Sequence, residues 1–261
     1  MTSSQISSSI IATDDAVLRS DVRRLGDLLG QSLVRQEGPE LLELVEKVRK
    51  AVREGGEDSL LEDITDDQAV DLVRAFSTYF HLANVAEQVH RARVLAEARA
   101  TGGSWLARAV DRIEAALKAQ TPGHELTKEE ITEWVGAMSV RPVFTAHPTE
   151  AARRSVLNKL GSIADLLDDP RNPSQQDRLA ETVDLLWQTD ELRLGRPEPL
   201  DEALNALYYL DDLFTQTVPE VLNDFAKEMK RIDVEVPITA RPLSFGNWIG
   251  GDRDGNPNIT A

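Results

Sequence analysis

The sequence has no cysteine, no long apolar run and far fewer basic than acidic residues. Without cysteine the chain cannot form disulfides, thiolate nucleophiles or cysteine metal sites, which fits a reducing, cytoplasmic compartment. No apolar run approaches the ~20 residues of a membrane-spanning helix. Residues 1–12 are serine-rich and lack the basic start and apolar core of a signal peptide. The net charge of −16 leaves no basic stripe for nucleic acid. We therefore predict a cytoplasmic protein that binds neither membranes nor nucleic acid.

Helical periodicity dominates the first half of the chain. After residues 1–13, predicted to be disordered, apolar residues recur at spacings of three and four as far as residue 138. Breaks at Gly38-Pro39, Gly55-Gly56 and Gly102-Gly103 divide this region into helices. Capping pairs mark two further helix starts, Thr65 with Gln68 and Thr127 with Glu130. Trp105 is predicted to face the core.

A short apolar stretch, residues 140–146, predicts a buried strand that ends at His147. Pro148 suits the first position of a helix and Glu150 the third, so His147 is predicted to cap a helix that continues to residue 168. Ligands bind at such joints in α/β sheets and barrels. The positive helix end favours a neutral imidazole. On residue type alone, a satisfied polar residue at a strand end is the favoured explanation of His147, because a single histidine is a weak signal.

Two features favour an anion site near His147. Three arginines, Arg141, Arg153 and Arg154, lie within a stretch of fourteen residues. Near the end of the chain, residues 245–258 contain four glycines, which can turn backbone N–H groups toward an anion, and Arg253 stands between Asp252 and Asp254. By composition this segment also fits a plain solvent-exposed loop, and its spacing does not fit a calcium-binding EF-hand.

The second half is predicted to be helical with one further strand. Helices are expected over residues 179–194 and 200–231, the latter kinked or split by Pro219, with a loop at 169–176. Residues 234–240 are predicted to form the second strand, and Trp248 is interpreted as a core residue. His81 and His90 are nine residues apart, on opposite sides of a helix, so they cannot share a metal.

Several ordered motifs resemble phosphoenolpyruvate carboxylase, in its bacterial rather than plant form. The resemblance runs from about residue 76 to the last residue. Its histidine motif is Thr145-Ala146-His147-Pro148-Thr149-Glu150-Ala151-Ala152-Arg153-Arg154. Its second signature is Phe245-Gly246-Asn247-Trp248-Ile249-Gly250-Gly251-Asp252-Arg253-Asp254-Gly255-Asn256-Pro257-Asn258. Two further stretches also match the family: Leu82-Ala83-Asn84-Val85-Ala86-Glu87-Gln88-Val89-His90-Arg91 and Trp187-Gln188-Thr189-Asp190-Glu191-Leu192-Arg193.

The resemblance implies a mainly α fold, with N-terminal helices followed by the first strands of an incomplete α/β (TIM-like) barrel. Two strands cannot close a barrel, and family members are several times longer, so the chain is expected to be an N-terminal fragment. Its expected division is a disordered start at 1–13, a helical region at 14–138 and a truncated start of the catalytic barrel at 139–261. The full-length family is usually a homotetramer and an allosteric enzyme.

The resemblance also implies a reaction, the carboxylation of phosphoenolpyruvate by bicarbonate to oxaloacetate and phosphate, which replenishes the tricarboxylic acid cycle. His147 matches the family's catalytic histidine. Arg253, Asp252, Asp254, Arg153, Arg154 and Trp248 are candidates for binding substrate or shaping the site. The family uses Mg²⁺ or Mn²⁺, with ligands expected outside this chain, so we predict no metal ligand here and no activity for the fragment alone.

Two functions of other classes stay open at this point. One is a phosphotransfer protein in which His147 carries phosphate. The other is a helical interaction module that retains the motifs without chemistry.

Overall fold

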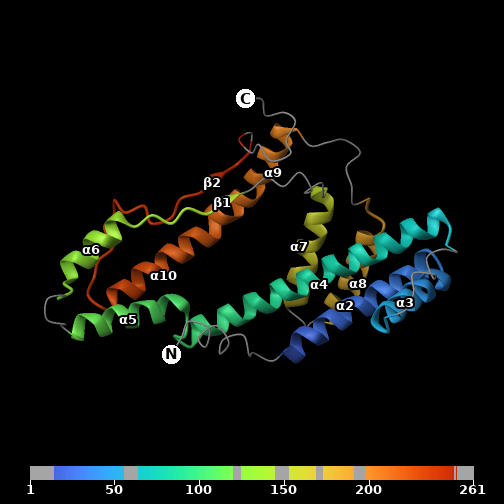
Figure 1. Ribbon diagram of the computed structural model, residues 1–261, viewed down its shortest axis with the longest axis horizontal. Coiled ribbons are helices and arrows are strands. Elements are labelled where there is room, and N and C mark those ends of the chain that lie inside the picture. The colour runs from blue at the N-terminus through green and yellow to red at the C-terminus, as the bar shows by residue number, and fades with distance from the viewer. Residues whose placement is uncertain are drawn as a thin grey trace. The chain divides into compact units, whose positions relative to one another are not determined.

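The computed structural model describes residues 15–55, 64–119, 125–144, 153–168, 173–190, 198–249 and 251. Most of these residues are helical (Figure 1), which confirms the mainly α prediction. The chain divides into two compact units. Unit 1 comprises Met1–Ala96 and Ala152–Arg193, and unit 2 comprises Glu97–Ala151 and Leu194–Ala261. The predicted domains at 14–138 and 139–261 stay a prediction, since these units are defined by packing alone.

Unit 1 is built from α2 (Asp15–Gln36), α3 (Pro39–Arg53), most of α4 (Asp66–Ala100), α7 (Arg154–Asp168) and α8 (Pro173–Trp187). The predicted breaks are confirmed: Gly38 and Gly55 have φ angles of 101° and 70°, which favour glycine. The capping box at the start of α4 is also present, with reciprocal hydrogen bonds between Thr65 and Gln68 of 3.0 and 3.3 Å.

Helix α7 begins at Arg154, and the Arg153 carbonyl accepts the N–H groups of Val156 and Leu157 and so occupies the cap position. The helix start predicted at Pro148 lies outside the described residues. Both ends of helix α8 differ from prediction. Helix α8 begins at Pro173, inside the predicted loop, since proline suits the first helical position. It ends at Trp187 instead of continuing to residue 194.

The core of unit 1 joins α2, α4, α7 and α8 through apolar side chains. Its fully buried members include Leu25, Leu33, Leu82, Ile163, Leu167, Leu179, Val183 and Trp187. Arg93 of α4 ties three helices at one edge. It donates to Asp21 of α2 at 2.7 Å, to Asp168 of α7 at 2.9 Å and to the Leu167 carbonyl at 2.6 Å.

Asp184 of α8 joins that helix to the end of α2. It accepts a hydrogen bond of 2.7 Å from Arg35. Partial burial raises the pKa of the Asp184 carboxyl, but hydrogen bonds from Arg35 and Ser32 outweigh it and hold the pKa below its ordinary value. The folded state therefore binds the Asp184 proton less tightly than the unfolded state does.

This lowered pKa predicts how Asp184→Asn changes stability with pH. A depressed carboxyl pKa stabilises the fold above the unfolded pKa of about 3.9 and loses that effect as pH falls through the folded pKa. Urea unfolding should show the variant to be less stable by about 1 kcal/mol at pH 7, with the difference from wild type shrinking below about pH 4. Asp177→Asn, at an exposed position of the same helix, is the control. A difference independent of pH, or one equal in the control, would contradict this role.

Unit 2 contains the last residues of α4, then α5 (Trp105–Ala119), α6 (Lys128–Ala137), β1 (Val143–Phe144), α9 (Pro199–Asp212), the π-helical turn η2 (Leu213–Thr217), α10 (Val218–Lys230) and β2 (Gly246–Asn247). Its core gathers buried residues of α5, α6, α10 and the loop after α10: Val110, Ile131, Val135, Met229, Ile232 and Val234.

Trp105 was predicted to face inward, which is wrong. It is 55% exposed, with the Arg108 guanidinium lying over its ring.

Pro219 splits the long helix, as predicted. The N–H of Val218 bonds to the Leu213 carbonyl, five residues back, which makes η2 a wide turn. Proline has no N–H to continue the regular ladder. The Thr215 hydroxyl also donates to the Asp211 carbonyl, at 2.8 Å. Together these explain why the helix changes its winding just before Pro219.

The two strands pair in parallel, Val143 with Gly246 and Phe144 with Asn247, and an isolated bridge joins Val140 to Leu243. The predicted second strand at 234–240 is wrong: the strand lies at Gly246–Asn247, and Val234 instead packs in the core. The buried strand at 140–146 is also wrong in part. Its described strand is two residues long, with Val143 46% exposed. Full burial of a parallel strand requires cover on both faces.

Candidate active site

The parallel pairing of β1 with β2 brings together the strand that precedes the histidine motif and the strand within the second signature. Hydrogen bonds of 2.9 Å run from the Gly246 N–H to the Pro142 carbonyl and from the Trp248 N–H to the Phe144 carbonyl. Because parallel strands end at the same edge of a sheet, the chain leaves both strands on one side. His147 follows Phe144 by three residues, and Asp252 follows Trp248 by four. This edge is the candidate active site.

Four of the predicted site residues, His147, Asp252, Arg253 and Asp254, lie outside the described residues. The helix cap predicted for His147 lies there as well. The roles of these four residues therefore stay predictions.

Trp248 was interpreted as a core residue, and this is wrong. It is 51% exposed, and its backbone N–H extends the strand ladder beyond Asn247. Side chains alternate along a strand, so Trp248 lies on the same face as Gly246. Trp248 directly follows β2, at the end of the strand pair from which the second signature continues.

Gly246 allows a close approach of Arg141. A Cβ atom at this glycine would lie 3.3 Å from the Arg141 Nε and 3.5 Å from Val143 Cγ2. Arg141 therefore packs across β2. It belongs to unit 2, whereas Arg153 and Arg154 belong to unit 1. The anion site predicted for these three arginines therefore stays a prediction.

Arg153 and Arg154 stand where the histidine motif enters α7. The Arg153 guanidinium lies 3.5 Å from the Asp190 carboxylate, whose side chain is 79% exposed. Part of the Arg153 charge is therefore neutralised by a residue of the family-like segment 187–193. Arg154 is the first residue of α7 and is exposed.

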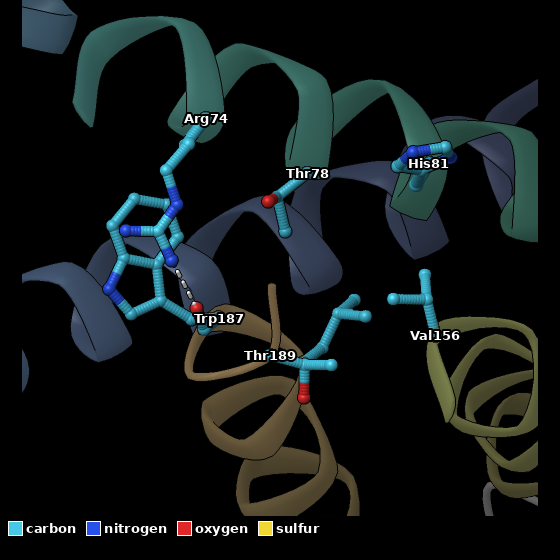
Figure 2. Close-up of a pocket in the computed structure, with 7 residues that line it drawn as sticks. Arg74, Thr78, His81, Val156, Trp187 and Thr189 are labelled. Atoms are coloured by element: carbon cyan, nitrogen blue, oxygen red, sulfur yellow. Dashed lines mark hydrogen bonds between the residues drawn. The ribbon is translucent and has the colours of Figure 1, made fainter. Parts of the chain in front are cut away.

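Trp187 forms an anchor that the sequence analysis did not identify. Its indole N–H donates to Glu37 at 2.9 Å, and the Arg74 guanidinium lies 4.4 Å from its ring centroid while donating to its carbonyl at 2.7 Å. Figure 2 shows Arg74 lying over the ring, with Thr78 and His81 along the same helix. Arg74 satisfies one of the last carbonyls of α8. Arg74 and Trp187 are 113 residues apart, so no local sequence pattern predicts this contact.

A small hollow adjoins this anchor, between α4, the start of α7 and the end of α8 (Figure 2). Its volume of about 10 Å³ has room for roughly one water molecule. Thr78, His81 and Thr189 supply the polar part of its lining.

Among the described residues, no group of three histidine, aspartate or glutamate side chains could hold a metal ion. In that part of the chain, no helix is long and apolar enough to cross a membrane.

Comparison with known proteins agrees with the motifs at this edge. The sequence profile described as phosphoenolpyruvate carboxylase matches residues 18–261. Proteins named phosphoenolpyruvate carboxylase from Xanthomonas campestris and Pseudomonas aeruginosa are 39% and 37% identical, covering 98% and 95% of this chain. The relative from Xanthomonas euvesicatoria is 37% identical over 98% of the chain. The chain spans about 30% of the length of these relatives. The chain belongs to the phosphoenolpyruvate carboxylase family.

Proposed function

We propose that this chain forms part of an enzyme that carboxylates phosphoenolpyruvate with bicarbonate, giving oxaloacetate and phosphate. The observation that carries the proposal is the parallel pairing of β1 with β2, which directs the histidine motif and the second signature from one edge. Family membership supplies the reaction, since the matching relatives carry that name. An active site at the carboxyl ends of parallel strands also agrees with α/β barrels in general.

The proposed chemistry has two stages. A bicarbonate oxygen attacks phosphorus, the bond from phosphorus to the enol oxygen breaks, and carboxyphosphate and the enolate of pyruvate form. His147, as a neutral base, then takes the carboxyphosphate proton. The carbon–oxygen bond to the phosphate group then breaks, which releases carbon dioxide and phosphate, and protonated His147 returns the proton to the departing phosphate. The enolate carbon attacks carbon dioxide to form oxaloacetate. A histidine that was permanently charged could not act as this base.

The remaining candidates would bind or orient anions. Arg253 between Asp252 and Asp254 can contact an anionic group while the aspartates hold its guanidinium in place. Arg153 and Arg154 stand at the start of α7, where positive charge would favour the same ligands. Trp248 would form part of the wall, as its exposed indole allows.

Mg²⁺ or Mn²⁺ is expected for the family, where it would stabilise negative charge on phosphate and enolate oxygens. The described residues do not provide a ligand set for it, so no step is assigned to the ion here. We also propose that the strand pair belongs to an α/β barrel, and that the complete enzyme is cytoplasmic, homotetrameric, allosteric and anaplerotic.

The test is a chimaera in which these 261 residues replace the matching part of the Pseudomonas aeruginosa relative. Phosphate and oxaloacetate would be assayed separately, with magnesium, phosphoenolpyruvate and bicarbonate. We expect both products in equal amounts. A folded chimaera that makes no oxaloacetate would refute the proposed function and favour an interaction module, whereas stable phosphate on His147 would favour the phosphotransfer alternative.

The 261-residue chain alone is expected to make no oxaloacetate in the same assay, because the family's metal ligands are expected to lie outside it. The chimaera serves as the positive control. Metal-dependent oxaloacetate formation by the purified chain would show that its residues suffice for catalysis.

A further inference from the structure

Three aromatic rings connect the strand pair to the wide turn η2. Phe144 of β1 and Phe245, which directly precedes β2, are stacked with centroids 6.1 Å apart and planes at 29°. Phe214 of η2 meets Phe245 edge-on, with centroids 5.3 Å apart and planes at 75°. Both geometries are favourable for aromatic pairs. We call Phe144, Phe214 and Phe245 the aromatic triad.

Two members of the triad stand directly before the candidate site. Phe144 is followed by Thr145-Ala146-His147, and Phe245 opens the second signature. Phe144 ends β1 and Phe245 directly precedes β2, so a shift of either ring would move the strand pair from which both segments leave. Phe214 comes from a different element, and its contact with Phe245 supports both strands from the helical side.

The winding of η2 determines where Phe214 points. A π-helical turn includes one more residue than an α-turn, and each residue of an α-helix rotates the chain by about 100°. Without the wide turn, Phe214 would therefore face a different direction relative to α10, which Met229 anchors in the core. Such turns are frequent at functional sites. This one directs the Phe214 ring toward Phe245, which precedes β2.

We propose that Phe214 is a positioning residue for the carboxylation step, acting through Phe245 and Phe144 to align the strand ends that lead to His147 and Arg253. The catalytic part of this inference rests on the proposed function. Phe214 is itself 54% exposed, so its removal should leave unit 2 folded while weakening the alignment of the strands.

Hydrogen exchange on the 261-residue chain tests the alignment without requiring activity. In Phe214→Ala, the Gly246 and Trp248 amides, which donate to β1 carbonyls, should exchange about tenfold faster, because an aromatic contact is lost. Phe214→Leu, which keeps apolar bulk, should show a smaller change. Leu207→Ala is the matched control, since Leu207 is 59% exposed on α9. Unchanged exchange at Gly246 and Trp248, or an equal change in the control, would overturn the proposal.

The catalytic part is tested in the chimaera by the ratio of oxaloacetate to phosphate. Loss of folded enzyme lowers both products equally and leaves this ratio unchanged. Misalignment of His147 leaves carboxyphosphate to be hydrolysed by water, which releases phosphate without supplying carbon dioxide to the enolate. Phe214→Ala should therefore lower the ratio severalfold, and Leu207→Ala should not. A parental ratio with Phe214→Ala would overturn the positioning role. If the parent chimaera makes no oxaloacetate, the proposed function fails, and the exchange measurement still decides whether Phe214 aligns the strands.

Discussion

Replacing His147 with asparagine in the chimaera is expected to lower the rate of oxaloacetate formation by about 10²–10⁴-fold, the range that a general acid or base contributes. Asparagine is close in shape to part of the imidazole but cannot take up a proton. The step assigned to His147 follows the attack on phosphorus. Carboxyphosphate still forms in the variant and can be hydrolysed by water to bicarbonate and phosphate, while the enolate takes up a proton to give pyruvate. Phosphate release should therefore persist, and the ratio of oxaloacetate to phosphate should fall toward zero.

The same substitution at His90 provides the control. His90 lies on α4 in unit 1 and is partly exposed, so His90→Asn should leave both products at parental rates. Two results would contradict the role of His147. A variant that keeps the parental product ratio does not need a base at this position. A variant that loses phosphate release as completely as oxaloacetate would place His147 at the first stage instead.

Truncating Trp187 to alanine is expected to destabilise the chain by about 3–5 kcal/mol, as is usual for a buried tryptophan. Trp187 is 2% exposed and is among the largest fully buried side chains. Its loss would leave a cavity, remove the hydrogen bond to Glu37 and leave the Arg74 guanidinium without its aromatic partner. Urea denaturation followed by far-ultraviolet circular dichroism measures this effect.

Two further variants separate packing from polar contacts at Trp187. Trp187→Phe keeps an aromatic ring but lacks the N–H donor, so it should cost about 1–2 kcal/mol, in the range of one lost hydrogen bond with a small packing defect. Trp134→Ala removes a tryptophan that is 60% exposed on α6, and surface substitutions usually change stability by about 0.5 kcal/mol or less. Equal destabilisation by Trp187→Ala and Trp134→Ala would show that Trp187 is not an anchor.

Trp105 shows that a helical pattern in the sequence does not by itself predict which side chains are buried. Periodicity indicates which residues share a face of a helix, but it does not say which face another element will cover. Trp105 lay on an apolar stripe and was predicted to be inside, yet it is 55% exposed. On α9, Leu200, Leu204 and Leu207 also follow helical spacing, and each is more than half exposed. Burial of a helix face depends on neighbours that are distant in sequence.

Local chemistry by itself determined much about this protein. Backbone hydrogen bonds and φ angles depend on nearby residues, so several helix boundaries were predictable. These are the caps at Thr65 and Thr127, the breaks at Gly38, Gly55 and Gly102, and the change of winding before Pro219. The motifs around His147 and Arg253 likewise indicated the family, which the comparisons confirmed.

Tertiary structure alone decided which strands pair next to these motifs. The pairing of Val143 with Gly246 joins residues about a hundred positions apart, and Arg74 reaches Trp187 across 113 positions. The second strand was misplaced at 234–240, because a two-residue strand has no periodicity to detect. Strand pairing is a contact between distant segments, set by packing such as that of the aromatic triad, and a sequence pattern records only what is near in the chain.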